Sequence, residues 1–267
     1  MNTPSSEPHE LAVIMPVYNE AAVIGTVLAK WAAELDRLGL DYQIHAYNDG
    51  SRDATLAALQ RAAAEHPRVC VHDKRNSGHG PTILLGYREH TDARWIFQVD
   101  SDDEMGPEHF HALWERRSRC DFLIGTRAQR ASPWPRRVMS LVSRLVVRLC
   151  YGRGVYDVNA PYRLMRTAAF EPLIAAVPPD TFAPNVILAG LACLHKLRIF
   201  ETPVPHQCRQ TGEVSIRSFK LIKVSLRSFR QTIGFRVHLA CENARRLLHL
   251  HPGRAAAPLP ASAAGRP

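Results

Sequence analysis

The segment LAVIMPVYNEAAVIGTVLAKWAAELDRL, residues 11–38, decides the fold class of this chain. Its opening residues, Leu11–Val17, are apolar without a break, which is typical of a strand buried on both faces of a parallel sheet. The stretch Ala21–Leu38 then carries apolar residues at helical spacing, at Val23, Val27, Leu28, Trp31 and Leu35. A buried strand that leads directly into an amphipathic helix is the repeating unit of a parallel α/β sheet.

Strand and helix patterns continue to alternate up to about residue 125. Further strands are predicted at Tyr42–Tyr47, Arg68–Asp73, Trp95–Val99 and Asp121–Gly125. Helices are predicted at Ala54–Glu65, between the loop Asn76–Pro81 and Tyr87, and from Pro107 to about Arg117. This alternation predicts an α/β fold with a mostly parallel, Rossmann-like sheet flanked by helices.

Polar residues follow several of the predicted strands, at the point where each strand ends. These polar segments are Asn19–Glu20, Asn48–Asp49, Asn76–Gly80 and Asp100–Glu104. In a doubly wound sheet the ligand binds at the carboxyl ends of the strands. We therefore expect the polar segments to line one edge of the sheet and to form the binding site there.

The segment VDSDDE, residues 99–104, is the most acidic of these strand ends. Two carboxylates that are two residues apart, on a turn that leaves a strand, can bind one Mg²⁺ or Mn²⁺ ion together with substrate phosphates. An exposed acidic turn that stabilises the helix opened by Pro107 fits the same residues. An EF-hand is excluded, because Met105 and His111 stand where that loop needs its glycine and its bidentate glutamate.

The composition is that of an ordinary globular protein. Of 267 residues, 46% are hydrophobic and 22% are charged, which excludes collagen-like, coiled-coil and wholly disordered chains. No apolar run is long enough for a membrane span, and residues 1–9 do not resemble a secretory signal, so we expect a cytoplasmic protein. The six cysteines contain no CxxC pair, and their spacing argues against a zinc site.

The two halves of the chain carry opposite charge. Residues 1–126 contain 12 Lys and Arg against 19 Asp and Glu, whereas residues 127–267 contain 22 against 6, which gives net charges of −7 and +16. An acidic half is where a divalent metal would be held, and a basic half is suited to phosphorylated or anionic partners. No helix-turn-helix, zinc or aromatic RNA-binding pattern accompanies the charge, so nucleic acid is not an expected partner.

Two segments of the basic half combine cationic and apolar residues. Pro135–Tyr151 is predicted to form an amphipathic helix, and Ser215–Leu250 a long helical tract that breaks near Gly234. Such helices can lie on an anionic membrane surface. They can equally pack their apolar side on the sheet and leave their charges in water, and the sequence leaves both alternatives open. The Ala/Pro/Gly-rich tail, residues 252–267, is predicted to be disordered.

Several motifs, taken in order, resemble those of glycosyltransferase family 2, the inverting enzymes with a GT-A fold. The motifs are AVIMPVYNE (12–20), YNDGSRDAT (47–55), NSGHGPTILLGY (76–87), VDSDDE (99–104) with GTR (125–127), and DVNAPYRLMR (157–166) with RQTGEVS (209–215). The later motifs are most similar to the branch that contains dolichyl-phosphate mannose synthase and polyprenyl-phosphate glycosyltransferases. The resemblance implies a GT-A domain over residues 10–215, preceded by a flexible segment 1–9 and followed by amphipathic helices over 216–251.

The resemblance also implies which residues bind the nucleotide-sugar donor. Pro16, Tyr18 and Glu20 match the motif that holds the nucleoside, and Asp49 matches the acid that contacts base or ribose. The implied metal ligands are Asp100, Asp102 and Glu104, with Mg²⁺ or Mn²⁺ as the cofactor. Arg163, in the element that begins at Asp157, is a further implied binding residue, and Arg209 and Ser215 fit the segment that closes over the diphosphate. The sequence departs from the family pattern at Asn48, at Glu104, where the phosphate-acceptor branch has Gln, and at Ala160–Pro161.

The resemblance places Arg127 on the acceptor side, followed by the binding element that contains Arg137 and Ser140. The implied catalytic residues are Asp102, Asp157 and Arg127. A hydroxyl acceptor needs a base, and Asp157 is the first candidate. A phosphate acceptor is already ionised, so Arg127 and Arg137 would only have to orient it.

The expected function is the transfer of a hexose from a UDP- or GDP-sugar to a polyprenyl phosphate or a glycan, at the inner face of the cytoplasmic membrane. The alternatives are a transferase that acts on a soluble sugar hydroxyl and an inactive sugar-nucleotide-binding protein. Nucleotidylyl transfer is disfavoured, because Pro16–Asn19 stands where such enzymes have a glycine-rich loop.

Overall fold

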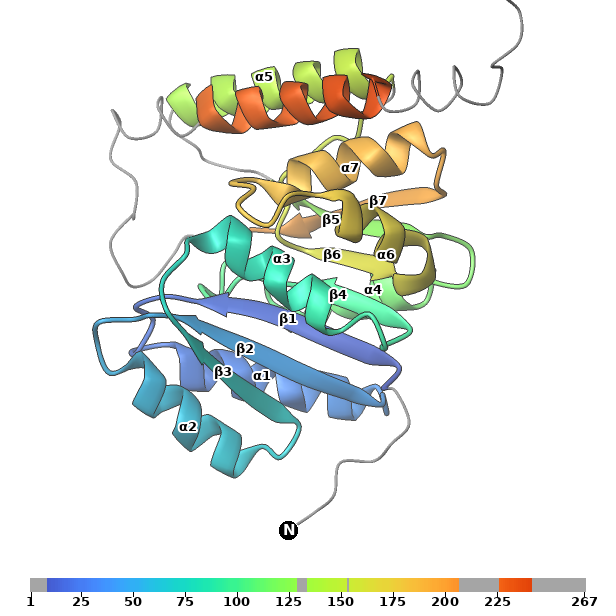
Figure 1. Cartoon of the computed structure of the whole chain (residues 1–267). Coiled ribbons are helices and arrows are strands. Elements are labelled where there is room, and N and C mark those ends of the chain that lie inside the picture. Colours follow the sequence, from blue (N-terminus) through green and yellow to red (C-terminus); the bar gives the residue numbers. More distant parts are fainter. Residues whose placement is uncertain (1–8, 129–133, 153, 207–225, 242–267) are drawn as a thin grey trace, which may run out of the picture.

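The computed structural model describes residues 9–128, 134–152, 154–206 and 226–241 (Figure 1). Its seven-stranded sheet has the order β3-β2-β1-β4-β6-β5-β7. The strands are β1 (Leu11–Val17), β2 (Tyr42–Asp49), β3 (Val69–Lys74), β4 (Trp95–Gln98), β5 (Phe122–Ala128), β6 (Arg163–Arg166) and β7 (Ile199–Pro205). The helices are α1 (Ile24–Arg37), α2 (Thr55–Glu65), α3 (His79–Glu89), the 3₁₀ turn η1 (Pro107–His109), α4 (Phe110–Trp114), α5 (Trp134–Tyr151), α6 (Thr167–Ala176) and α7 (Pro184–Leu194), and residues 226–241 are also helical.

The first four strands run parallel to one another, as the alternation of strand and helix predicts. β6 is the exception, because it pairs antiparallel with both β4 and β5. β7 restores the parallel direction next to β5. The reversal of β6 brings the chain that precedes it, which includes Asp157, to the edge where β4 and β5 end.

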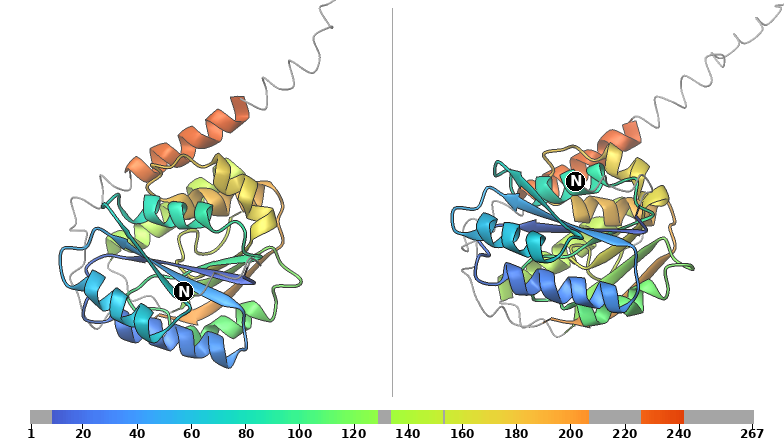
Figure 2. Two further views of the ribbon diagram at one scale, coloured as in Figure 1. Left: turned by 60° about the horizontal axis from the view of Figure 1, so that its bottom comes forward. Right: turned by 90° about the horizontal axis from the view of Figure 1, so that it is seen from below.

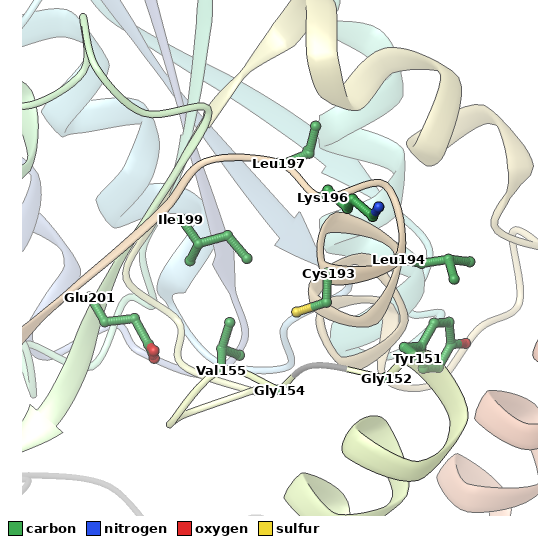
Figure 3. A pocket seen from close by; sticks show the side chains of 10 residues that line it. All are labelled: Tyr151, Gly152, Gly154, Val155, Cys193, Leu194, Lys196, Leu197, Ile199 and Glu201. Atoms are coloured by element: carbon green, nitrogen blue, oxygen red, sulfur yellow. The ribbon is translucent and has the colours of Figure 1, made fainter.

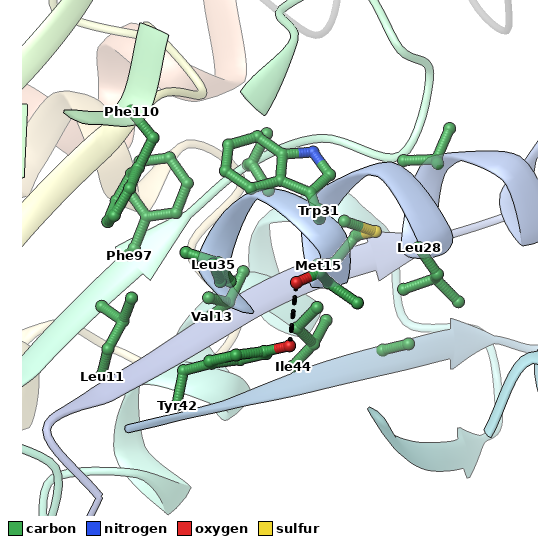
Figure 4. Packing of buried hydrophobic residues seen from close by; sticks show 14 of the residues in the cluster. Leu11, Val13, Met15, Leu28, Trp31, Leu35, Tyr42, Ile44, Phe97 and Phe110 are labelled. Carbon is green, nitrogen blue, oxygen red and sulfur yellow. Dashed lines mark hydrogen bonds between the residues drawn. The ribbon is translucent and has the colours of Figure 1, made fainter. Parts of the chain in front are cut away.

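Helices cover both faces of the sheet, and Figure 2 shows the sheet between these two layers. On one face, α1 and α2 pack on the strands around Trp31, whose ring lies 5.3 Å from Phe97 and 6.1 Å from Phe110 (Figure 4). The Tyr42 hydroxyl is buried in the same cluster and donates to the main-chain carbonyl of Ala32. On the other face, α3, α6 and α7 form the second core cluster. Two apolar layers on a central sheet account for the continuous apolar run of β1.

α5 and the helix over residues 226–241 form an outer layer beyond α7 (Figure 1). The Tyr151 hydroxyl donates to the Thr232 carbonyl, and the Arg236 Nε donates to the Cys150 carbonyl, so the two helices are joined directly. Val147 and Phe235 point from this layer into the second core cluster. Of the described residues, no helix is both long enough and apolar enough to cross a membrane.

The structure corrects the predicted elements in two ways. The helix does not break near Gly234 but runs through it from residue 226 to 241, since a glycine costs a helix interior only about 1 kcal/mol and buried neighbours compensate for it. The helix predicted from Pro107 to about Arg117 is shorter, a 3₁₀ turn followed by α4, which ends at Trp114. Three predictions concern residues that lie wholly or partly outside the described ones. They are the flexible segment 1–9, of which only residue 9 is described, the tail 252–267, and the parts of the 215–250 tract before residue 226 and after residue 241.

Candidate active site

The polar segments that follow the parallel strands lie together, as the sequence predicts. The Ser51 hydroxyl accepts from the Asn19 amide, and the Asn19 side chain accepts from the Arg52 amide at 2.8 Å. At the next strand ends, Asp49 accepts the amide of Ser77 at 2.8 Å. These contacts join the ends of β1, β2 and β3 into one polar edge.

The opening motif contributes one exposed ring to this edge. Pro16 is buried within β1, opposite Tyr47, whereas Tyr18 is 37% exposed just beyond the strand. Glu20 is buried, and its amide donates to Thr55 Oγ1 at 2.9 Å. Of the implied nucleoside-binding residues, Tyr18 is therefore the one that presents its side chain to a ligand, and Pro16 and Glu20 shape the turn beneath it.

Asp49 holds the loop between β3 and α3. Its carboxylate accepts from Lys74 Nζ at 2.5 Å and from the amides of Ser77 and Gly78 at 2.8 and 2.9 Å. Burial opposes ionisation of this carboxyl, but the hydrogen bonds from Lys74 and Ser77 prevail and lower its pKa. Asp49 thus fixes the loop that runs beside the acidic turn.

The acidic turn that follows β4 brings its carboxylates to the same edge. Asp100 accepts from Gln98 Nε2 at 2.9 Å and lies 3.6 Å from His79 Nε2. Asp102 accepts the Glu104 amide at 3.2 Å. Directly after Asp102 the chain turns at Asp103, which has a φ of 58° and pairs with Lys30 at 2.5 Å.

Burial raises the pKa of Asp100, and the charge of Glu104 raises it further, against the opposing effects of His79 and Arg127. A carboxylate that is costly to ionise in the protein alone gains most from a cation. The donor set, two aspartates and a glutamate in a turn, supplies the oxygen ligands that Mg²⁺ and Mn²⁺ prefer. These residues therefore fit the implied divalent metal.

A buried hydrogen-bonded chain supports Asp100 from below. The Tyr87 hydroxyl donates to Asn185 Oδ1 at 2.9 Å, and Asn185 Nδ2 donates to Gln98 Oε1 at 2.9 Å. Gln98 Nε2 in turn donates to Asp100 Oδ1. The chain links α3, α7 and β4, and it orients Gln98 so that only its donor can face the carboxylate. Sequence reasoning missed this chain because its members are far apart in the sequence.

Arg127 and Asp157 form a bidentate ion pair. Arg127 Nε and Nη2 donate to the two oxygens of Asp157 at 2.7 and 2.8 Å, with side-chain exposures of 12% and 15%. Burial lowers the pKa of the Arg127 guanidinium, but the hydrogen bonds to Asp157 outweigh this and raise it. Nearby, burial raises the pKa of Glu201. Both Asp157 oxygens therefore serve Arg127 in this structure.

Arg163 occupies a position that its motif did not reveal. It is fully buried, and its guanidinium donates to the main-chain carbonyls of Ala160, Val158 and Asn185. These bonds fix the chain between Asp157 and β6. In this structure the Arg163 guanidinium is therefore enclosed by main-chain carbonyls and has no exposed surface to offer a ligand.

The structure describes only part of the remaining predicted site residues. Arg137 and Ser140 lie within α5, and their side chains are outside the described part. Arg209 and Ser215 are outside the described residues altogether. One residue that sequence reasoning missed is His206, whose Nε2 lies 2.7 Å from Glu104 Oε2. It follows β7 directly, so the end of that strand meets the acidic turn.

A pocket of about 630 Å³ lies between α5, α7 and the start of β7 (Figure 3). Its lining includes Tyr151, Val155, Cys193 and Glu201. None of its lining residues is among the predicted site residues, so this pocket is not the space that the acidic turn and Arg127 surround.

The topology and the acidic turn at the strand ends define a GT-A fold. A family model described as "Glycosyl transferase family 2" matches residues 12–173. Since this match covers more than half of the chain, the protein belongs to glycosyl transferase family 2.

Curated relatives include the undecaprenyl-phosphate 4-deoxy-4-formamido-L-arabinose transferases of Edwardsiella ictaluri and Pseudomonas aeruginosa. The first is 29% identical over 218 residues, which is 80% of this chain and 65% of the relative. The second is 30% identical over 217 residues, 80% of this chain and 62% of the relative. The chain thus spans slightly less than two thirds of the length of these relatives.

Solved structures confirm the fold at low identity. Glucosyl-3-phosphoglycerate synthase from Mycobacterium tuberculosis, in complex with Mn²⁺, UDP and glucosyl-3-phosphoglycerate, has a TM-score of 0.62 at 14% identity, over 85% of this chain and 80% of that one. A mannosyltransferase from Pyrobaculum calidifontis, in complex with GDP-Man and Mn²⁺, has a TM-score of 0.56 at 14% identity, over 92% and 80%.

Proposed function

We propose that this protein transfers a hexose from a nucleotide-sugar donor to a polyprenyl phosphate, with inversion at the anomeric carbon. The observation that carries the proposal is the bidentate pair of Arg127 and Asp157 beside the acidic turn. In this pair, the Asp157 carboxylate, which a hydroxyl acceptor would need as its base, is already hydrogen-bonded to Arg127. The Arg127 guanidinium would be available to bind an anionic acceptor. The relatives named for undecaprenyl-phosphate support the same acceptor class.

On the donor side, Asp100 and Asp102 would hold Mg²⁺ or Mn²⁺, with Glu104 and its partner His206 next to them. When bound, the cation would neutralise charge that develops on the leaving diphosphate. Tyr18, whose ring is exposed beside the same edge, would cover the nucleoside. Asp49 would act indirectly, since it fixes the 76–80 loop through Ser77 and Gly78.

In the reaction, an oxygen of the acceptor phosphate forms a bond to the anomeric carbon. The bond from that carbon to the diphosphate oxygen breaks at the same time, and the electron pair leaves with the nucleoside diphosphate. The acceptor oxygen carries no proton, so no general base is required. Arg127 would orient the phosphate through charge-assisted hydrogen bonds, and Asp157 would keep the guanidinium in place.

The outer helices support binding at a membrane surface. In α5, Leu141, Leu145 and Leu149 are 62%, 53% and 74% exposed, at the spacing of one helix face. In the adjoining helix, Leu226 and Val237 are 60% and 55% exposed. These side chains do not pack on the sheet, which favours the first of the two alternatives that the sequence leaves open. Exposed leucines among arginines are typical of helices that lie in a bilayer interface. We propose peripheral binding to the inner face of the cytoplasmic membrane.

The test is a transfer assay on the full chain with labelled UDP- and GDP-hexoses, with Mn²⁺ or with a chelator. Undecaprenyl phosphate, a soluble glycan and phosphoglyceric acid serve as parallel acceptors. We expect metal-dependent transfer to the lipid phosphate, and at least a hundredfold loss in Asp102→Asn, since a cation supplies several kcal/mol to such a transition state. Asp92→Asn, an exposed carboxylate elsewhere, is the matched control.

Each of the other outcomes would indicate a different function. Transfer only to the soluble acceptors would refute the polyprenyl-phosphate assignment. Tight donor binding without transfer to any acceptor would indicate the inactive sugar-nucleotide-binding alternative. Full activity of Asp102→Asn would refute the metal role of the acidic turn.

A further inference from the structure

Three histidines lie together near the edge strand β3, among residues that the proposed reaction does not use. His45 is in β2, His72 is in the edge strand β3, and His90 directly follows α3. Tyr47 pairs with His72 in the β2–β3 register, and His45 pairs with Cys70. Residues paired in this way, and those two positions apart on one strand, share a face of the sheet. All four therefore lie on the face that α3 covers.

The nitrogens of these histidines are arranged as metal ligands would be. One ligand atom from each of His45, His72 and His90 lies within 4.8 Å of the others. His45 Nδ1 and His72 Nε2 are 3.1 Å apart. In a tetrahedral zinc site with bonds of about 2.0–2.1 Å, neighbouring ligand nitrogens are about 3.3 Å apart. Two of the three ligands thus already have the separation that a bound ion requires.

The third histidine is positioned by a hydrogen-bonded pair next to it. The Tyr47 hydroxyl donates to Glu89 Oε2 at 2.6 Å and lies 2.9 Å from His90 Nε2. Because its hydrogen goes to Glu89, the Tyr47 oxygen accepts from His90 Nε2–H. This leaves Nδ1 of His90 with the lone pair. Metal-binding histidines usually donate their other ring nitrogen to such a partner. The His90 ring stacks on His45 with ring centroids 3.5 Å apart, and it is half-buried.

The side chains that lie together here offer imidazole nitrogens. Glu89, the nearby carboxylate, is engaged by Tyr47. A ligand set of imidazole nitrogens suits Zn²⁺ and its neighbours better than Mg²⁺ or Mn²⁺.

We propose that His45, His72 and His90 form a second metal site, which binds a divalent transition metal of the Zn²⁺ class and leaves one coordination position open to water. The site would fasten the edge strand β3 to β2 and α3. His72 is two residues before Lys74, which contacts Asp49. A metal here would therefore hold the strand that presents Lys74 to the donor edge. The cysteine spacing argues against a zinc site bound by cysteines. A site formed by histidines from three separate elements has no characteristic sequence spacing, so the sequence pattern does not reveal it.

The experiment uses the full chain without a histidine tag, stripped with a chelator and titrated with Zn²⁺ against a chromophoric competitor. We expect one tight equivalent in the wild type and in Asp102→Asn, which disables the acidic turn. His72→Gln and His90→Gln are expected to weaken Zn²⁺ binding at least tenfold. His195→Gln, an exposed histidine after α7, is the matched control. Zn²⁺ should raise the melting temperature of the wild type, of Asp102→Asn and of His195→Gln, but not that of His72→Gln or His90→Gln.

A measurement on the wild type alone protects the test against variants that fail to fold. Co²⁺ bound by three imidazoles and a water should give the strong visible absorption of a four-coordinate site, whereas six oxygen ligands give a weak band. Unchanged zinc affinity in folded His72→Gln and His90→Gln would overturn the proposal. It would also fall if the tight equivalent vanished in Asp102→Asn, or if the wild type bound no zinc and gave only the weak cobalt band.

Discussion

Asp157→Asn separates the two roles that this carboxylate could have. The substitution keeps the shape of the side chain but removes its charge, so the amide can accept only one of the two hydrogen bonds from Arg127. The pair is mostly buried, with 12% and 15% of the side chains exposed. Loss of one charge-assisted bond and weakening of the other costs about 2–3 kcal/mol. If that energy orients the acceptor phosphate, kcat/KM for polyprenyl phosphate should fall about 30- to 150-fold.

The assay measures kcat/KM for the lipid acceptor between pH 6 and 9 in the wild type, Asp157→Asn, Arg127→Lys and the double variant. Since no proton moves to Asp157, the single variants should keep the pH dependence of the wild type. Since the two residues act as one unit, the double variant should be little worse than either single variant. Our reasoning would be refuted if Asp157→Asn abolished an acidic limb of the profile while Arg127→Lys stayed nearly as active as the wild type.

Three further predictions concern stability and membrane binding. Asp49→Asn should destabilise the protein at neutral pH, and the difference from the wild type should shrink as the pH falls below about 3.9, because the depressed pKa of Asp49 adds stability above its unfolded value that is lost on acidification through the folded pKa. Urea unfolding from neutral to acid pH measures the effect, and a difference that does not change with pH would contradict it. Arg163→Gln should lower the free energy of unfolding by about 3 kcal/mol, since several bonds from a buried guanidinium to carbonyls disappear; thermal and urea melts test this, and a loss below about 1 kcal/mol would argue against it. The double change Leu145→Gln and Leu149→Gln should weaken flotation with anionic liposomes at least tenfold, because each exposed leucine gains about 1.5–3 kcal/mol on burial; unchanged flotation would show that α5 is not the contact.

The donor half of the fold could be predicted from the sequence because its physics is local. β1 is an apolar run that leads into a helix of regular apolar spacing, β2 lies between two such helices, and the polar residues at the ends of both strands meet at one edge as expected. The second half could not be predicted in this way. β6 is only four residues long and has an arginine at each end, and β7 contains two prolines, so neither has the pattern of a buried strand. α7 is buried throughout and shows no amphipathic face.

The candidate site follows the same division. Asp100 and Asp102 are neighbours in the sequence, and their place in the structure follows from the end of β4. Partners from distant segments are set by tertiary packing alone. Arg163 illustrates this, because its motif implies a ligand contact and only the fold shows that its guanidinium is enclosed by carbonyls. Glu104 and His206 meet for the same reason, since β7 ends beside the turn that follows β4.

The reversed direction of β6 has a mechanical consequence for the chemistry. In a fully parallel sheet, a further segment at the same edge would have to follow a long crossover connection. Here the chain re-enters between β4 and β5 against their direction, so that Asp157 arrives just before a rigid, hydrogen-bonded strand. The groups proposed to bind donor and acceptor are thereby attached to strands that are hydrogen-bonded to each other, so the sheet fixes their spacing. On the proposed reaction, a change of acceptor would then be accommodated in the outer helices without altering that spacing.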